Sequence, residues 1–154
     1  MTSATPCVLT INGGSSSIRF AVYEAGASLR LQLGGKVDRV GVSGTTLTVN
    51  DSTGSPQATL RLAVADHRSA AGALLEWLEA QPLFAAIKVV GHRVVHGMQH
   101  TEPQRVTTPL LAELRRITPF APDHLPREIA LIAALRRRHP KLPQVVCFDT
   151  AFHR

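Results

Sequence analysis

The pattern of apolar and polar positions divides the chain into a β-rich first part and a second part in which helices and strands alternate. Up to about residue 65 the apolar runs are short, and clusters of Gly, Ser, Thr, Asn and Pro separate them. Such runs predict strands that are joined by tight turns and paired antiparallel. We expect strands over residues 7–12, 17–24, 27–40, 46–49 and 58–64, the last one half-buried because its apolar and polar residues alternate.

From Asp66 onward, apolar residues recur at helical spacing. Ala71, Leu74, Leu75 and Leu78 occupy positions i, i+3, i+4 and i+7 of one amphipathic helix, for which Asp66 is a suitable N-cap. Apolar runs and further amphipathic stretches then alternate, which predicts an α/β fold built in layers. We expect further strands over residues 87–90 and 144–148, and further helices from residue 108 and over residues 127–139.

Three polar residues fall where predicted strands end, namely Asn12, Arg93 and Asp149. Ligands of α/β sheets collect outside the carboxyl ends of the strands, so these residues indicate a binding site. An arginine between apolar residues needs an anionic partner, which a ligand's carboxylate or phosphoryl group or an acid of the same domain would supply. A carboxylate at position 149 suits a Mg²⁺ contact, the orientation of a nucleophile, or a turn cap.

Small residues fill the turn between the first two expected strands, at positions 13–17, and Arg19 follows them. Glycines let the backbone approach a bound group closely, and the turn's amides and hydroxyls together with Arg19 suit a phosphate. The same residues also suit the loop of an ordinary β-hairpin. The turn alone leaves both interpretations open.

Composition excludes several classes of protein. The 154 residues, 44% of them hydrophobic and 18% charged, suit one folded domain. No apolar run has the roughly 18–20 residues that cross a bilayer, and the first six residues lack the regions of a secretory signal. We therefore expect a cytoplasmic protein with no membrane partner, in which Cys7 and Cys147 are buried, reduced thiols.

The net charge of +6 comes mainly from residues 105–141, which carry eight cations and three acids. A nucleic-acid face would carry such an excess, and so would solvated helix ends, where cations suit the C-terminal dipole. The segment has little aromatic interleaving and no nucleic-acid motif, so no nucleic-acid partner is expected. A nucleic-acid module stays as the third functional hypothesis.

Four segments, in this order, resemble motifs of the acetate kinases, the acetokinase family that includes propionate and butyrate kinases. The segments are INGGSSSIRF (11–20), GHRVVHG (91–97), APDHLP (121–126) and FDTAFH (148–153). The resemblance extends from about residue 7 to the end of the chain. It implies an α/β domain of the ribonuclease-H-like type found in the acetate and sugar kinase, Hsp70 and actin superfamily, a mixed sheet with flanking helices.

The resemblance also implies reversible, ATP- and Mg²⁺-dependent phosphorylation of acetate or a related short-chain carboxylate to an acyl phosphate. Asn12 would contact the transferred phosphoryl group, and Ser15, Ser17 and Arg19 would line the phosphate or metal region. Asp149, together with Asn12, would hold Mg²⁺ directly or through water, or Asp149 would position the nucleophile.

Three further residues take roles by the same resemblance. Arg93 would clamp the carboxylate or the transition state, Val95 would wall the methyl pocket, and His124 would hydrogen-bond the phosphoryl group in flight. Arg93, His124 and Asp149 are thus the expected catalytic residues. Phosphoryl transfer depends mostly on positioning and charge neutralisation, which such a set supplies.

The sequence departs from the family pattern at several positions. Arg19 stands where the family usually has Lys, which keeps the charge and changes its shape. Met98 replaces a Gly, and Asp123 and Leu125 replace the common Leu and Asn beside His124. The charge of Asp123 would weaken anion binding there.

Members of the family continue well beyond this length and carry a second domain. Residues 1–154 are therefore expected to be the N-terminal domain of such an enzyme, inactive alone, which forms homo-oligomers or pairs with a separate C-terminal half. The alternative is a non-catalytic relic or accessory domain that binds a carboxylate or phosphate and pairs with a separately encoded second half.

Overall fold

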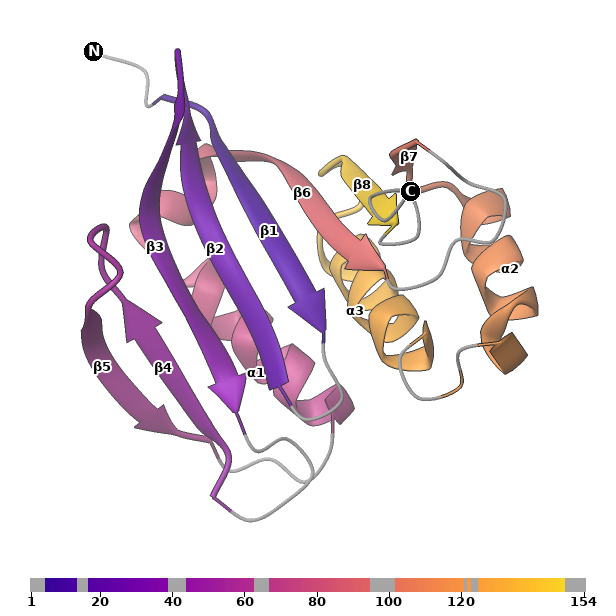
Figure 1. Cartoon of the computed structure of the whole chain (residues 1–154), viewed down its shortest axis with the longest axis horizontal. Coiled ribbons are helices and arrows are strands. Elements are labelled where there is room, and N and C mark those ends of the chain that lie inside the picture. The colour runs from indigo at the N-terminus through magenta and orange to yellow at the C-terminus, as the bar shows by residue number, and fades with distance from the viewer. Residues whose placement is uncertain are drawn as a thin grey trace.

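The computed structural model describes residues 5–13, 17–38, 44–62, 67–94, 102–120, 122 and 125–148. These residues form an eight-stranded mixed sheet in the order β5-β4-β3-β2-β1-β6-β8-β7, with helices packed on one of its faces (Figure 1). None of the described helices is both long enough and apolar enough to cross a membrane.

The first five strands form an antiparallel meander, in which each strand pairs with the next along the chain. This arrangement confirms the β-rich, antiparallel first part that the sequence pattern predicts. The strands are β1 (Cys7–Gly13), β2 (Ser17–Ala25), β3 (Leu29–Asp38), β4 (Thr46–Asn50) and β5 (Pro56–Arg61).

Three strands extend the sheet on the other side of β1. β6 (Ile87–Val94) pairs parallel with β1, and β8 (Gln144–Phe148) pairs parallel with β6, so the carboxyl ends of all three point the same way. β7 (Gln104–Arg105) pairs antiparallel with β8 at the edge. The sequence pattern did not indicate β7, because two residues are too few to show alternation.

The described α-helices are α1 (His67–Glu79), α2 (Thr108–Arg116) and α3 (Leu125–Arg138), and short 3-10 helices span Pro82–Ala86 and Thr118–Phe120. Figure 1 shows α1 and α3 behind the sheet and α2 beyond α3, on the side of β7 and β8. The Thr107 hydroxyl caps α2 by accepting a hydrogen bond from the Leu110 amide at 3.2 Å.

The hydrophobic core lies between the sheet and these helices. The predicted apolar stripe of α1 is buried, since its residues are at most 2% exposed: Ala71, Leu74, Leu75 and Leu78. A second buried cluster joins β6 and β8 to α2 and α3, and Phe148 is its largest member. Burial of this apolar surface, at roughly 25 cal/mol per Å², is the main term that stabilises the fold.

Two sequence predictions need correction. The strand expected over residues 58–64 as half-buried is β5, and all six of its residues are exposed. β5 is the last strand of the sheet, and Figure 1 shows α1 behind the centre of the sheet rather than behind β5, so alternation along β5 has no core to face. Cys7 is buried with a free thiol, as expected, whereas Cys147 is only partly buried. The expected N-cap Asp66 lies outside the described residues.

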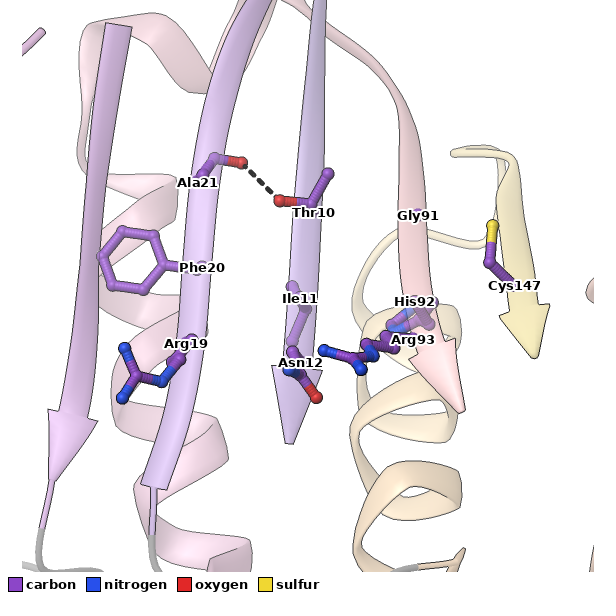
Figure 2. Close-up of a pocket in the computed structure, with 10 residues that line it drawn as sticks. All are labelled: Thr10, Ile11, Asn12, Arg19, Phe20, Ala21, Gly91, His92, Arg93 and Cys147. Atoms are coloured by element: carbon purple, nitrogen blue, oxygen red, sulfur yellow. Dashed lines mark hydrogen bonds between the residues drawn. The ribbon is translucent and has the colours of Figure 1, made fainter. Parts of the chain in front are cut away.

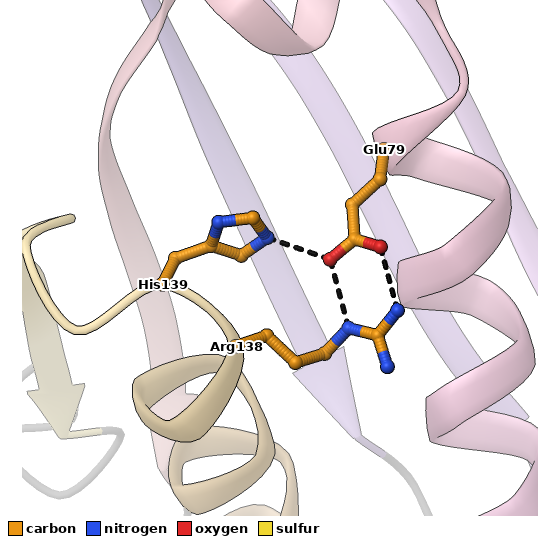
Figure 3. Close-up of polar contacts among 3 residues, drawn as sticks. All are labelled: Glu79, Arg138 and His139. Atoms are coloured by element: carbon orange, nitrogen blue, oxygen red, sulfur yellow. Dashed lines mark hydrogen bonds and ion pairs between the residues drawn. The ribbon is translucent and has the colours of Figure 1, made fainter.

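A carboxylate at the end of α1 joins that helix to the end of α3 (Figure 3). Arg138 donates from Nε to Glu79 Oε2 at 2.8 Å and from Nη2 to Glu79 Oε1 at 2.6 Å, and His139 Nε2 lies 2.6 Å from Glu79 Oε2. These contacts, the Arg138 hydrogen bonds first among them, lower the pKa of Glu79 to about 2. The cluster therefore fastens together the two helices that cover the sheet.

Replacement of Glu79 by Gln is expected to lower the free energy of unfolding by about 1 kcal/mol near pH 7, a value that allows for solvent screening of this partly exposed cluster. The pKa of Glu79 in the folded state lies below its ordinary value of 4.5, so the stabilisation is complete above that value and is lost as pH falls toward 2. Urea unfolding measures the free energy of unfolding of the wild type and of E79Q. The difference between the two should be about half as large near pH 3 as it is at pH 7. The control is Glu76→Gln, on an exposed position of the same helix, where the carboxylate attracts Arg138 only at longer range and should contribute much less to stability. If E79Q lowers the free energy of unfolding by the same amount at every pH, the charge of Glu79 is not what stabilises the contact with Arg138 and His139.

Candidate functional site

A cavity of about 520 Å³ lies at the carboxyl ends of β1 and β6, on the face of the sheet opposite α1 and α3 (Figure 2). Asn12 and Arg93 do lie at the ends of these strands, as the sequence predicts. Ligands of α/β sheets bind outside such strand ends. The cavity is lined by Thr10, Ile11, Asn12, Arg19, Phe20, Ala21, Gly91, His92, Arg93 and Cys147.

One row of paired residues crosses four strands at the cavity. Asn12 of β1 lies opposite Arg19 of β2 and also opposite Arg93 of β6, and Arg93 lies opposite Cys147 of β8. Residues paired in this way point to the same face of a sheet. The sheet register therefore gathers four side chains that are far apart in the sequence, and Figure 2 shows the Arg93 guanidinium extending toward Asn12.

The depth of the cavity comes from small residues in the next row on the same face. Thr10 pairs with Ala21 on one side and with Gly91 on the other, and the Thr10 hydroxyl donates to the Ala21 carbonyl oxygen at 3.4 Å. A Cβ placed on Gly91 would meet no other atom within 4 Å. Gly91 therefore borders open space, and a larger residue there would occupy the cavity.

The cavity is suited to anions. Arg19 and Arg93 lie on the two strands that flank Asn12, both among the lining residues, and no carboxylate of the described residues lines the cavity. Guanidinium groups bind carboxylate and phosphate oxygens through two parallel hydrogen bonds. Figure 2 shows the Arg93 guanidinium beside Asn12 and the Arg19 guanidinium turned toward β3. Arg93 with Asn12 can therefore bind one anionic group, and rotation of the Arg19 side chain toward the cavity would bring a second cation to a neighbouring anionic group.

Beside this row, a histidine faces the core and not the cavity opening. His92 is 3% exposed, and its Nε2 donates to Gln144 Oε1 at 2.5 Å, while Gln144 Nε2 donates to the Ile132 carbonyl oxygen at 3.3 Å. Burial lowers the pKa of His92 to about 4, so the ring is neutral at physiological pH. His92 therefore ties β6 to β8 and α3 directly behind Arg93, and it carries no charge to a ligand.

Sequence reasoning did not assign this role to His92. Alternation along the strand could have indicated it. Successive side chains of a strand point to opposite faces, so if Arg93 faces the cavity, His92 must face the core. The partner Gln144 is distant in sequence, so the pair itself becomes visible only in the structure.

Cys147 ends the row on β8. Burial raises the pKa of its thiol, so the group stays protonated at neutral pH and is a poor nucleophile. The cavity thus offers binding and positioning groups and, among the described residues, no activated nucleophile.

The other predicted site residues divide into two sets. Ser17 lies at the start of β2, two residues before Arg19 and on the same sheet face, but it is not among the lining residues. The remaining ones lie outside the described residues: Ser15, Val95, His124 and Asp149.

Mg²⁺ binds best to several oxygen ligands, which the described residues of the cavity do not supply. The described part of the chain contains no group of three or more His, Cys, Asp or Glu side chains that could hold a metal ion. The Asn12 amide supplies one oxygen, and the neighbouring Arg19 and Arg93 would repel a bare cation. These side chains therefore fit an anion and do not by themselves fit Mg²⁺.

Comparison with known proteins gives consistent matches. A model of the acetokinase family matches residues 7–154. Acetate kinases of Rhodopseudomonas palustris and Deinococcus radiodurans are 37% and 38% identical over 95% and 94% of this chain, and a propionate kinase of Citrobacter freundii is 38% identical over 95%. The chain spans only 38%, 36% and 36% of the length of these relatives.

Solved structures agree with the sequence matches. A propionate kinase from Francisella tularensis superposes with a TM-score of 0.84 at 26% identity, and an acetate kinase from Porphyromonas gingivalis with 0.83 at 28%. Each match covers 96% of this chain and 38% of the solved chain. These matches confirm the predicted fold class and the resemblance carried by the four sequence motifs.

Proposed function

Because this chain belongs to the acetokinase family, we propose that it forms the N-terminal half of a carboxylate kinase. The reaction is the reversible transfer of a phosphoryl group from ATP to acetate or a related short-chain carboxylate. The observation that carries the proposal is the row of Arg19, Asn12 and Arg93 across the cavity. Relatives that match over nearly the whole chain are named acetate kinase and propionate kinase.

The chemistry of the row suits this reaction. A carboxylate attacks a phosphoryl group that is itself negatively charged, so the site must reduce repulsion and hold the two groups in line. In the proposal, Arg93 binds the carboxylate and the charge that develops in the transition state, while Asn12 and Arg19 contact the phosphoryl oxygens. Their hydrogen bonds act on charge and position, and no side chain forms a covalent bond.

Further residues complete the proposed site. Ser15 and Ser17 would line the phosphate region, Val95 would wall the methyl pocket, and His124 would donate to the phosphoryl group. A Mg²⁺ site would depend on Asp149 with Asn12, and the bound ion would neutralise charge on the phosphoryl oxygens.

The chain is expected to be inactive alone, because it spans little more than a third of its relatives' length and the rest would close the cleft over ATP. The test is a fusion of residues 1–154 to the remaining segment of the Rhodopseudomonas palustris acetate kinase. Acyl phosphate made from ATP and acetate is trapped with hydroxylamine and measured. The fusion should form the acyl phosphate and the isolated chain should not. A folded fusion without turnover would favour the alternative, a non-catalytic domain that binds a carboxylate or phosphate.

Replacement of Gly91 by Val is expected to fill part of the cavity without disturbing the sheet. The new side chain meets open space, and valine suits a strand better than glycine does, so the free energy of unfolding should stay level or rise by up to about 1 kcal/mol. In the fusion, kcat/KM for acetate should fall by about tenfold or more, since a cavity that loses volume loses substrate contacts. Gly72→Ala, on α1 and also bordering open space, is the control and should leave kcat/KM unchanged. Full activity of G91V would show that the substrate does not occupy the part of the cavity beside Gly91.

A further inference from the structure

A second cavity, of about 400 Å³, lies where β7, the start of α2 and the end of α3 meet, on the right-hand side of Figure 1. Among the described residues, the two cavities share no lining residue. We propose that it is a separate anion-binding site that takes a small free polyanion carrying two or more phosphate groups. Its lining is Arg105, Val106, Thr107, Arg136, Pro140, Lys141, Leu142, Pro143 and Gln144.

Three cations from three different segments line this cavity. Arg105 belongs to β7, Arg136 to the last turn of α3, and Lys141 to the turn that leads into β8. None of the described residues that line it is acidic. Among the described residues, neither Arg105 nor Lys141 makes an ion pair. The convergence leaves a strong local excess of positive charge, which an anionic ligand would neutralise.

The dipole of α3 accounts for only part of this cluster. Cations in and just after the last turn of a helix suit its C-terminal dipole, which explains Arg136 and can also favour Lys141. Arg105 lies on β7 and not on a helix. Its approach to the same cavity has a different explanation, and a bound anion supplies one.

Neighbouring contacts hold the cavity in shape. The Val106 amide donates to the Gln144 carbonyl oxygen at 2.8 Å, which fixes β7 against β8, and the Leu142 amide donates to the His139 carbonyl oxygen at 3.1 Å. Arg136 Nη2 donates to the Thr108 hydroxyl at 3.0 Å, which keeps its guanidinium beside the start of α2. A preorganised site loses less entropy when a ligand binds.

The start of α2 adds to the positive potential. Thr107, the N-cap, lines the cavity, and the first turn of the helix contains no acidic residue. The positive end of the α2 dipole therefore adds to the charge of the three cations, which together outweigh the partial negative charge at the end of α3 beside the same cavity. A cavity of this volume exceeds what one phosphate ion fills and lies within the range of small-ligand pockets, so it suits a compact polyanion.

Inorganic pyrophosphate is the probe for the test, titrated into the 154-residue chain by calorimetry at about 20 mM salt, where screening is weak. The double variant R105Q/K141Q removes two exposed cations from the cavity. Its matched control, R30Q/R61Q, removes two exposed cations from β3 and β5, at the other end of the sheet. We expect a pyrophosphate site that is weakened at least tenfold in R105Q/K141Q and by less than twofold in R30Q/R61Q and in R93Q, which separates it from any weaker binding at the first cavity.

Several results would overturn the proposal. Equal weakening in both double variants would mean that only the overall charge attracts pyrophosphate. Loss of binding in R93Q with none in R105Q/K141Q would place pyrophosphate in the first cavity. Tighter binding of a single-stranded oligonucleotide that pyrophosphate does not displace would identify a nucleic-acid face, and tighter binding of succinate than of pyrophosphate would exclude a phosphate ligand. None of these results depends on kinase activity, so this site and the proposed function succeed or fail separately.

Discussion

Replacement of Arg93 by Ala in the active fusion is expected to lower kcat/KM for acetate by about 10³-fold. Arg93 lies beside Asn12 in the row that crosses the cavity, where the proposal puts the attacking carboxylate. Without the guanidinium, two negative groups would have to approach each other with one cation fewer. The loss should appear in kcat as well as in KM, because the charge is largest in the transition state.

Two further variants make this prediction specific. Arg93→Lys keeps the charge but loses the planar fork that binds two oxygens at once, so it should recover only part of the activity. Arg61→Ala removes an exposed arginine from β5, far from the cavity along the sheet, and should change kcat/KM by less than twofold. Retention of more than a tenth of the activity by R93A would remove Arg93 from the proposed mechanism.

Replacement of Gly35 by Ala is expected to cost roughly 3 kcal/mol or more of unfolding free energy, the largest stability effect that we predict from a single added methyl group. A Cβ at Gly35 would overlap the backbone carbonyl oxygen of Thr48 on β4 and press on the Phe20 ring at 3.0 Å. A backbone oxygen in a paired strand cannot move without loss of sheet hydrogen bonds. The strain would therefore fall on the pairing of β3 with β4.

The neighbouring glycine supplies a matched control for this substitution. A Cβ at Gly34 would lie 3.5 Å from its nearest neighbour, which is an ordinary contact, so Gly34→Ala should change the free energy of unfolding by less than about 1 kcal/mol. Urea unfolding of both variants measures the difference. Equal stabilities would show that β4 moves away freely, in contradiction to the close approach at Gly35.

The spacing of apolar residues predicted most helices and strands correctly, because the side of each element that packs on the core must be apolar. The stripe of α1 from Ala71 to Leu78 is buried as its spacing indicates, and β1, β2, β6 and β8 lie within a few residues of their predicted ranges. Alternation failed at β5, where the same pattern has no helix to face. The spacing of apolar residues shows which face of a strand could be buried. Whether a helix covers that face depends on the position of the strand in the sheet.

The candidate site was predicted in part for a similar reason. Strand-end position and motif resemblance singled out Asn12, Arg19 and Arg93, and the structure brings these three together. Gly91, Thr10 and Cys147 could not be anticipated, because they line the cavity only through the register of β1 with β2, β6 and β8. The second cavity depends on β7 and on a turn, and neither leaves a periodic signal.

The most direct test of the anion site is a titration of the ¹⁵N-labelled chain with acetyl phosphate at constant ionic strength, followed by NMR. Asn12, Arg19 and Arg93 all lie in this chain, so we expect saturable binding in the millimolar range even without the second half. The largest shifts should fall on the amides of Asn12, Arg19 and Arg93, and R93A should remove them. Saturable shifts confined to β7 and α3, or none at all on β1, β2 and β6, would contradict the claim that this row binds the reacting anions.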